Sequence, residues 1–314
     1  MDALTRIRLL ADLDRYFSLL DRFGSEPSIG QPYGGHSNLP NIFFVDSASG
    51  AATNSGRRPE RALITIDAAV NLCTANNGDI IIVLPGHAET ISTAGGLALD
   101  IAGISVIGMG EGQDRPRLTM SAVASSVTVG AASIRLQNIL FLSTAASTIV
   151  VDVNSTDFTI EECEFRRTSG TVPVTSIDIN GGAANAADRA RILNCVHDTG
   201  TNVGYSQFVE LGEIANGVEI AGCRVFGDFL NACIHNPIGF ICTGLYVHDN
   251  YLTNLQTGDH SIELVSACTG ALVRNMYQND MTQATGSDPG SCWNFENYHS
   301  DAIDLSAIIS PLAT

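Results

Sequence analysis

The sequence predicts an all-β fold, a right-handed parallel β-helix of about eight rungs, with an N-terminal α-helix in front of it. Short apolar–polar–apolar triplets recur with a period in the mid-twenties, and a second apolar strand follows the middle triplets after a short gap. Hydrophobic residues make up 45% of the 314 residues, but charged residues only 16%. The solvent-exposed surface must therefore consist largely of Ser, Thr, Asn and Gly, which suit stacked strands and turns. A solenoid can accommodate 314 residues in a single domain.

Residues 1–24 are predicted to form a helical arm. Their apolar side chains recur at steps of three and four residues, the period of a helix, and Gly24 follows as a stop signal. The stripe consists of Leu4, Ile7, Leu10, Leu13, Phe17, Leu20 and Phe23. Because the stripe is wide, we expect it to be a binding surface: it caps the solenoid, bundles with copies of itself or docks on a neighbour. Residues 25–40, rich in Gly, Pro and Ser, are predicted to be a linker.

The β-helix domain is predicted to span residues 41–310 and to open with a strand over 42–46. A Gly-containing loop over 47–61 follows, and then a short helix over 65–73. The turn at 76–79 leads into an apolar strand over 80–84, which Pro85 and Gly86 end.

Repetition dominates from there on. The triplets are Leu99–Asp100–Ile101, Val127–Thr128–Val129, Val151–Asp152–Val153, Ile177–Asp178–Ile179, Val209–Glu210–Leu211, Ile234–His235–Asn236, Ile262–Glu263–Leu264 and, as a last candidate, Ile303–Asp304–Leu305. The second strands begin at Ile134, Ile160, Ile192, Val218, Val247 and Leu272. Alternation along a strand places the flanking apolar residues inside and the central residue outside. Two columns in register fit a coil whose turns lie over one another.

Two sets of small side chains are expected to have structural roles. Asn138, Asn194, Asn250 and Asn275, near the ends of the second strands, predict an asparagine ladder in which amides bond from rung to rung. The eight cysteines form no CxxC motif and no Cys/His zinc spacing, and several lie within apolar strands. We expect them to be reduced and buried, as in a protein that folds in a cytoplasm.

The charge and the patterning limit the classes of partner. A net charge of −17 and a pI near 4.6 repel phosphate backbones, so no nucleic-acid partner is expected. The sequence shows no secretory signal and no run of 18 apolar residues that would span a membrane. No motif indicates a metal or a cofactor.

The central residues of the triplets predict an acidic column on one outer face. Adjacent rungs lie about 4.8 Å apart, so Asp152 and Asp178 would present two carboxylates at roughly the separation that a retaining glycosidase uses. If the protein is an enzyme, Asp152, Asp178 and Glu210 are the catalytic candidates, with His235 nearby. The same column also fits a solvated face, a subunit contact or a site for cations. Against catalysis, the acids form a continuous ladder, aromatic residues make up only 6% of the chain, and its tyrosines fall in no single column.

The opening of the domain resembles that of pectate-lyase-like β-helix proteins. The residues that carry the resemblance are Phe43–Phe44–Val45–Asp46, Ile66–Asp67–Ala68–Ala69 and the stretch from Gly78 to Gly86. Residues 67–91 are most similar to β-helix proteins of tailed bacteriophages. The family's lyases use calcium-binding aspartates and an arginine base, but no arginine is placed beside the acidic column, so that mechanism does not carry over.

The resemblance implies a virion structural protein, either a capsid decoration or head protein or part of a tail fibre. Such a protein would be a homotrimer that contacts other capsid or tail proteins and is assembled in the host cytoplasm. The alternative is a tail spike that binds or degrades a host surface polysaccharide. Of the two roles, the structural one is favoured over the enzymatic one. The fold does not decide between them, since the same scaffold carries lyases, hydrolases and inert structural proteins.

Overall fold

The computed structural model describes residues 40–168, 173–182, 186–256, 258–279 and 287–301. The predicted arm over residues 1–24 and the linker over 25–40, apart from Pro40, lie outside these ranges, as does the triplet around Asp304. No helix in the described part of the chain is long and apolar enough to cross a membrane.

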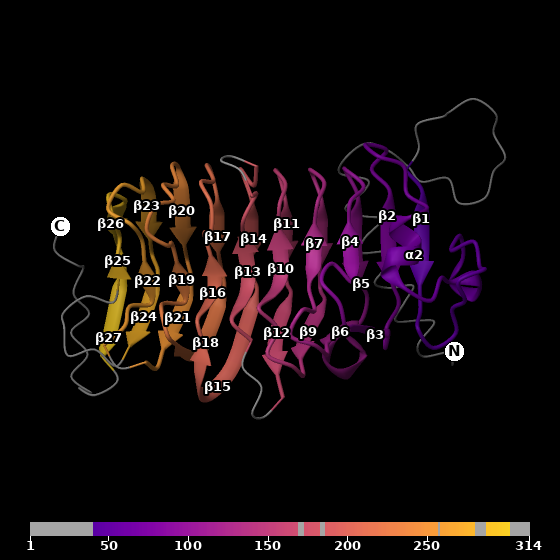
Figure 1. The fold of residues 1–314 in the computed structure, drawn as a ribbon, viewed down its shortest axis with the longest axis horizontal. Helices are drawn as coiled ribbons and strands as arrows, with labels where there is room; N and C mark the ends of the chain where they lie inside the picture. The colour runs from indigo at the N-terminus through magenta and orange to yellow at the C-terminus, as the bar shows by residue number, and fades with distance from the viewer. Residues whose placement is uncertain (1–39, 169–172, 183–185, 257, 280–286, 302–314) are drawn as a thin grey trace.

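The described chain winds into three parallel sheets that run side by side along one axis, and this confirms the predicted parallel β-helix (Figure 1). Sheet A contains β1 (Ile42–Val45), β2 (Ile80–Val83), β5 (Ser105–Gly108), β8 (Arg135–Gln137), β11 (Thr159–Glu161), β14 (Arg191–Leu193), β17 (Glu219–Ala221), β20 (Leu245–His248), β23 (Gly270–Val273) and β26 (Trp293–Phe295). Sheet B contains β3 (Ala88–Ile91), β6 (Arg117–Met120), β9 (Leu140–Ser143), β12 (Glu164–Arg167), β15 (Val196–Tyr205), β18 (Arg224–Phe229), β21 (Tyr251–Asn254), β24 (Met276–Asn279) and β27 (Tyr298–Asp301). Sheet C contains β4 (Leu97–Leu99), β7 (Val127–Val129), β10 (Ile149–Val153), β13 (Thr175–Ile179), β16 (Gln207–Glu210), β19 (Ile234–His235), β22 (Ile262–Glu263) and β25 (Ser287–Asp288).

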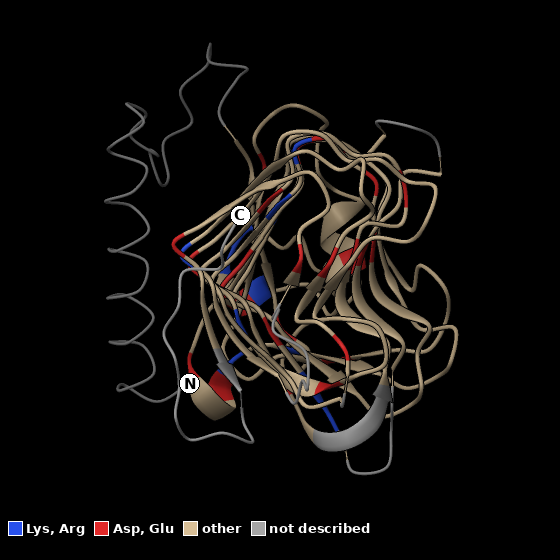
Figure 2. Ribbon diagram, turned by 90° about the vertical axis from the view of Figure 1, so that its left-hand side faces the viewer, with Lys and Arg blue, Asp and Glu red and all other residues tan. Residues whose placement is uncertain are grey.

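The predicted triplets belong to sheet C and the predicted second strands to sheet A, whereas sheet B is a third strand per rung that the sequence pattern did not reveal. Seen along the axis, the successive rungs superimpose (Figure 2). Inward side chains stack from one rung to the next, as Phe141 does on Phe165 with ring centroids 4.9 Å apart. One apolar core therefore runs through the coil.

The first rung is closed by the predicted short helix, α2 (Ile66–Val70), which is shorter than the predicted 65–73. Thr65 caps it by accepting a hydrogen bond from the Ala68 amide at 3.2 Å. Ile66, Ala69 and Val70 are buried. Two 3-10 turns, η1 (Pro59–Arg61) and η2 (Gly112–Asp114), lie in loops.

The corner between sheets A and B repeats one backbone conformation. The first corner residue has a positive φ of 52–65° in seven successive rungs: Asn138, Glu162, Asn194, Gly222, Asp249, Arg274 and Glu296. The next residue points inward and forms a stack of Ile139, Cys163, Cys195 and Cys223, which Asn250, Asn275 and Asn297 continue.

The predicted hydrogen bonding from rung to rung is correct for Asn250 and Asn275, and also for Asn138, whose Nδ2 donates to the Gly108 carbonyl at 2.9 Å. The prediction is wrong in placing Asn138 and Asn194 in the same inward column as the other two. Asn138 and Asn194 occupy the left-handed corner position, which asparagine tolerates better than most residues. Asn297, which the prediction omitted, extends the ladder. Its Oδ1 accepts from the backbone nitrogen of Asn275 at 2.7 Å and from the side-chain Nδ2 of Asn275 at 3.0 Å.

The cysteines are placed largely as predicted. Seven are buried, Cys73 is half-buried, and none is paired in a disulfide.

Candidate acidic site on sheet C

The acidic column predicted from the triplets exists on sheet C. Asp152 pairs in register with Asp178, Asp178 with Glu210, and Glu210 with His235. The column then continues through Glu263. Since strand residues that pair in register point to the same face, these side chains stand one above another along the coil.

Both ends of the predicted column need correction. Thr128 lies in it as expected, but its partner in β4 is Ala98, and Asp100 is an exposed residue that follows the strand. The predicted triplet was shifted by two residues because Leu97–Ala98–Leu99 and Leu99–Asp100–Ile101 have the same pattern. At the other end Asp288 pairs with Glu263. The prediction missed Asp288, although its 25-residue step fits the period better than the step to Asp304.

Asp178 differs from the rest of the column because it is only 5% exposed. Burial raises its pKa to about 7, and the neighbouring charges of Glu210 and Asp152 add to the shift. Its Oδ2 accepts a hydrogen bond from the Asn180 amide at 3.4 Å, and its Oδ1 is buried with no partner among the described residues. Gly212 leaves room for this carboxyl group, because a Cβ there would lie 2.5 Å from Oδ1.

Glu210 is held by a network of neutral side chains. The Gln207 amide donates to Glu210 Oε2 and also to Thr175 Oγ1, the latter at 2.8 Å. Thr175 in turn donates to Glu210 Oε2 at 3.2 Å, and Asn231 donates to Gln207 Oε1 at 2.9 Å. These hydrogen bonds fix the position of the Glu210 carboxyl group next to Asp178.

Asp152, on the other side of Asp178, is half-buried. Burial raises its pKa, while a hydrogen bond from Asn154 opposes the shift. The trio therefore contains a carboxyl group that keeps its proton near neutral pH between two further acids. Such an arrangement can donate a proton as a general acid, or store one. Among the described residues no group of three or more His, Cys, Asp or Glu side chains is placed to hold a metal ion.

Exposed aromatic residues gather on the last rungs, away from this trio. Tyr251, Met276 and Tyr298 share one column of sheet B, and Trp293, which is 77% exposed, is in register with Ala271 and Tyr246 in sheet A. Tyr205 and Tyr277 are buried instead. The tyrosines thus share no single column, as the sequence predicted, but two of them lie in one strip.

No protein-family model matches the chain, and no curated protein matches it. A solved structure of a rhamnogalacturonan lyase is similar with a TM-score of 0.41 and 12% sequence identity, over 86% of this chain and 89% of that one. No residue role is transferred from that protein.

Proposed function

We propose that this chain is a structural protein of a tailed-bacteriophage particle, a capsid decoration or tail-fibre component in which the β-helix is a rigid projecting body. The observation that carries the proposal is the continuous pairing of the coil. Each of the three sheets runs from the first rungs to the last without a break in strand order. A rod held by pairing on three sides resists bending, which suits a projecting part of a particle.

The opening of the coil agrees with the family resemblance from which the proposal starts. The strand β1, the cap α2 and the strand β2 occur where the resemblance to pectate-lyase-like β-helix proteins implies them. Asp79, at the start of that second strand, ties the opening together. It accepts from the Asn41 amide nitrogen at 2.7 Å and from the Thr74 amide nitrogen at 2.7 Å.

In this proposal the arm of residues 1–24 anchors the rod or trimerises it through Leu4, Ile7, Leu10, Leu13, Phe17 and Leu20. The protein would assemble in the host cytoplasm and contact capsid or tail proteins.

Purified particles from the source culture test the proposal directly. Mass spectrometry of gradient-purified particles should detect this chain in stoichiometric amounts, and antibodies against it should label the particles in electron micrographs. Light scattering should give the mass of a trimer for residues 1–314 and a smaller assembly for residues 40–314. A chain that is abundant in the lysate and absent from the particles would contradict the proposal.

The Asp152–Asp178–Glu210 trio favours a second candidate function, a tail spike that binds or cleaves a host surface polysaccharide. Asp178 would supply the proton for the leaving group, and Asp152 or Glu210 would be the second catalytic carboxyl group. Oligosaccharide release from host glycans, lost in Asp178→Asn and Asp152→Asn and kept in Asp100→Asn, would support this function. Equal activity in all three variants would exclude the trio from catalysis.

A further inference from the structure

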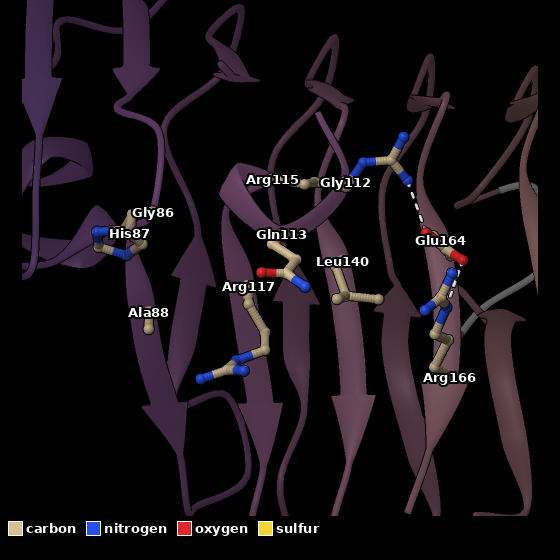
Figure 3. A pocket seen from close by; sticks show the side chains of 10 residues that line it. All are labelled: Gly86, His87, Ala88, Gly112, Gln113, Arg115, Arg117, Leu140, Glu164 and Arg166. Carbon is tan, nitrogen blue, oxygen red and sulfur yellow. Dashed lines mark hydrogen bonds and ion pairs between the residues drawn. The ribbon is translucent and has the colours of Figure 1, made fainter. Parts of the chain in front are cut away.

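A cleft of about 650 Å³ opens beside sheet B near the start of the coil, on a different sheet from the acidic trio (Figure 3). Gln113 of η2 and Arg115 just after it form one side of the cleft. Arg117, Leu140 and Glu164, the first residues of β6, β9 and β12, stand in register along the sheet. Arg166 of β12 completes it.

The charge in this cleft is opposite to that of the whole molecule. The chain carries 33 acidic residues and 16 basic ones, all of them arginine. Three of these arginines line the cleft, whereas Glu164 is its only lining carboxylate. A concentration of guanidinium groups in a concave site is what recognition of an anion requires.

Glu164 holds two of the arginines in place. Its Oε2 lies 2.9 Å from Arg115 Nη1, and its Oε1 lies 2.5 Å from Arg166 Nε. Figure 3 shows the carboxylate between the two guanidinium groups. One carboxylate balances one of the two positive charges, so this bridge keeps a net charge of +1 in a fixed geometry.

Two donors in the cleft remain available. Arg115 Nε is buried and has no hydrogen-bond partner among the described residues. Arg117 is exposed and makes no ion pair with any described carboxylate. Gln113 projects its amide toward the space near Arg117 and Leu140 (Figure 3). An unpaired buried donor is costly, and an anion that accepted from it would relieve that cost.

We propose that this cleft binds an oxyanion, the phosphate or carboxylate group of a small organic anion that enters from solvent. Arg117 would bind the oxyanion directly, and the Arg115–Glu164–Arg166 bridge, with its net charge of +1, would attract it from beside Arg117, while Glu164 competes with the anion for the two guanidinium groups. The planar fork of arginine matches both phosphate and carboxylate oxygens. The cleft is separate from the acidic trio and plays no part in the proposed structural role. The oxyanion proposal and the proposed function can therefore fail independently.

The test is a titration of the full-length protein with inorganic phosphate and, separately, with citrate, at constant ionic strength, with glycerol as the neutral control. Isothermal calorimetry measures the affinity, and ¹⁵N NMR follows the Nε–H signals of the arginine side chains. Addition of an anion should shift the Nε–H signal of Arg115. Binding of phosphate alone, of citrate alone or of both identifies the oxyanion that the cleft prefers.

Three variants give a pattern that separates a built site from general charge attraction. Arg117→Gln should weaken binding about tenfold or more, because it removes a charged hydrogen-bond donor. Arg224→Gln should leave the affinity unchanged, because Arg224 occupies the same outward column of sheet B, two rungs beyond Glu164 and outside the cleft. Glu164→Gln should tighten binding, because it frees two guanidinium groups. The Nε–H spectrum without ligand checks that each variant is folded.

The proposal is overturned if neither anion binds, if Arg117→Gln and Arg224→Gln weaken binding equally, or if Glu164→Gln weakens it in a folded protein.

Discussion

Replacing Asp178 with asparagine should change the free energy of unfolding, measured relative to the wild type, more favourably at pH 8 than at pH 5. The pKa of Asp178 is about 7 in the folded chain, against an ordinary value of 3.8 for an aspartate side chain. The folded state therefore binds the proton more tightly than the unfolded state. The stability that Asp178 contributes is fully present below about pH 4 and is lost as the pH rises through 7. The rise of its pKa from 3.8 to about 7 corresponds to about 4 kcal/mol, of which about 2.5 kcal/mol is lost between pH 5 and pH 8.

Asparagine keeps the shape of the carboxyl group and cannot ionise, so the variant should lose this part of the pH dependence. Urea unfolding at pH 5 and pH 8 measures the free energies, and ¹³C NMR of the Asp178 carboxyl group follows its titration directly. Asp100→Asn, an exposed replacement outside the column, is the matched control and should track the wild type. If Asp178→Asn also tracks the wild type at both pH values, the buried proton inferred here does not exist.

Three further replacements test other parts of the coil. His197→Phe should stabilise the protein by about 1 kcal/mol at pH 7 in urea unfolding, because both ring nitrogens of this buried histidine lack a hydrogen-bond partner among the described residues. Burial also lowers the pKa of His197 to about 3, so wild-type stability should fall as the pH drops from about 6.5 toward 3, and the Phe variant should not show this loss. Asn275→Ala should cost about 2–4 kcal/mol, measured by the urea midpoint, because it leaves the buried Asn250 amide nitrogen and the Val247 carbonyl without their ladder partner. Asp79→Asn should destabilise the opening of the coil: burial opposes ionisation of Asp79, but hydrogen bonds from Asn41, Thr74 and Asn77 outweigh it and lower its pKa. The loss should therefore be largest at neutral pH and shrink as the wild type itself loses stability in acid, which thermal unfolding from pH 7 to pH 3 would detect.

The sequence predicted sheets A and C because their strands alternate between buried apolar and outward polar residues. Val151–Asp152–Val153 and Ile177–Asp178–Ile179 show that alternation without ambiguity. Some strands of sheet B do not: Leu140 and Leu142 point outward in β9 and Ser143 points inward, and in β24 Met276 is exposed and Asn279 is buried. Where the outward position is apolar and the inward one polar, a pattern of period two loses its contrast, so these strands could not be found from the sequence.

The corner residues show a second limit of the sequence. Asn138 and Asn194 look like Asn250 and Asn275 in the sequence, but the first pair has a left-handed backbone and the second pair stacks inward. Both positions favour asparagine, for different physical reasons: tolerance of positive φ at the corner, and hydrogen bonding from one buried asparagine side chain to the next in the inward column. The residue type alone therefore does not distinguish the corner position from the inward one. The inward position is the one occupied by Cys163, Cys195 and Cys223 in the preceding rungs.

The acidic column, which the sequence left open between a solvated face, a contact or ion site and a catalytic site, divides when exposure is considered residue by residue. Asp288 is exposed and fits a solvated face, whereas Asp178 is buried between two acids and would cost several kcal/mol if ionised. A carboxyl group whose only role was solubility would gain nothing from that position, and asparagine would fill it at lower cost. The burial of Asp178 is therefore better explained by use of its proton, in catalysis or at a contact between chains, than by a solvated face. Activity and oligomeric state of Asp178→Asn separate the last two explanations, because a catalytic role would appear as lost activity and a contact role as a changed oligomeric state.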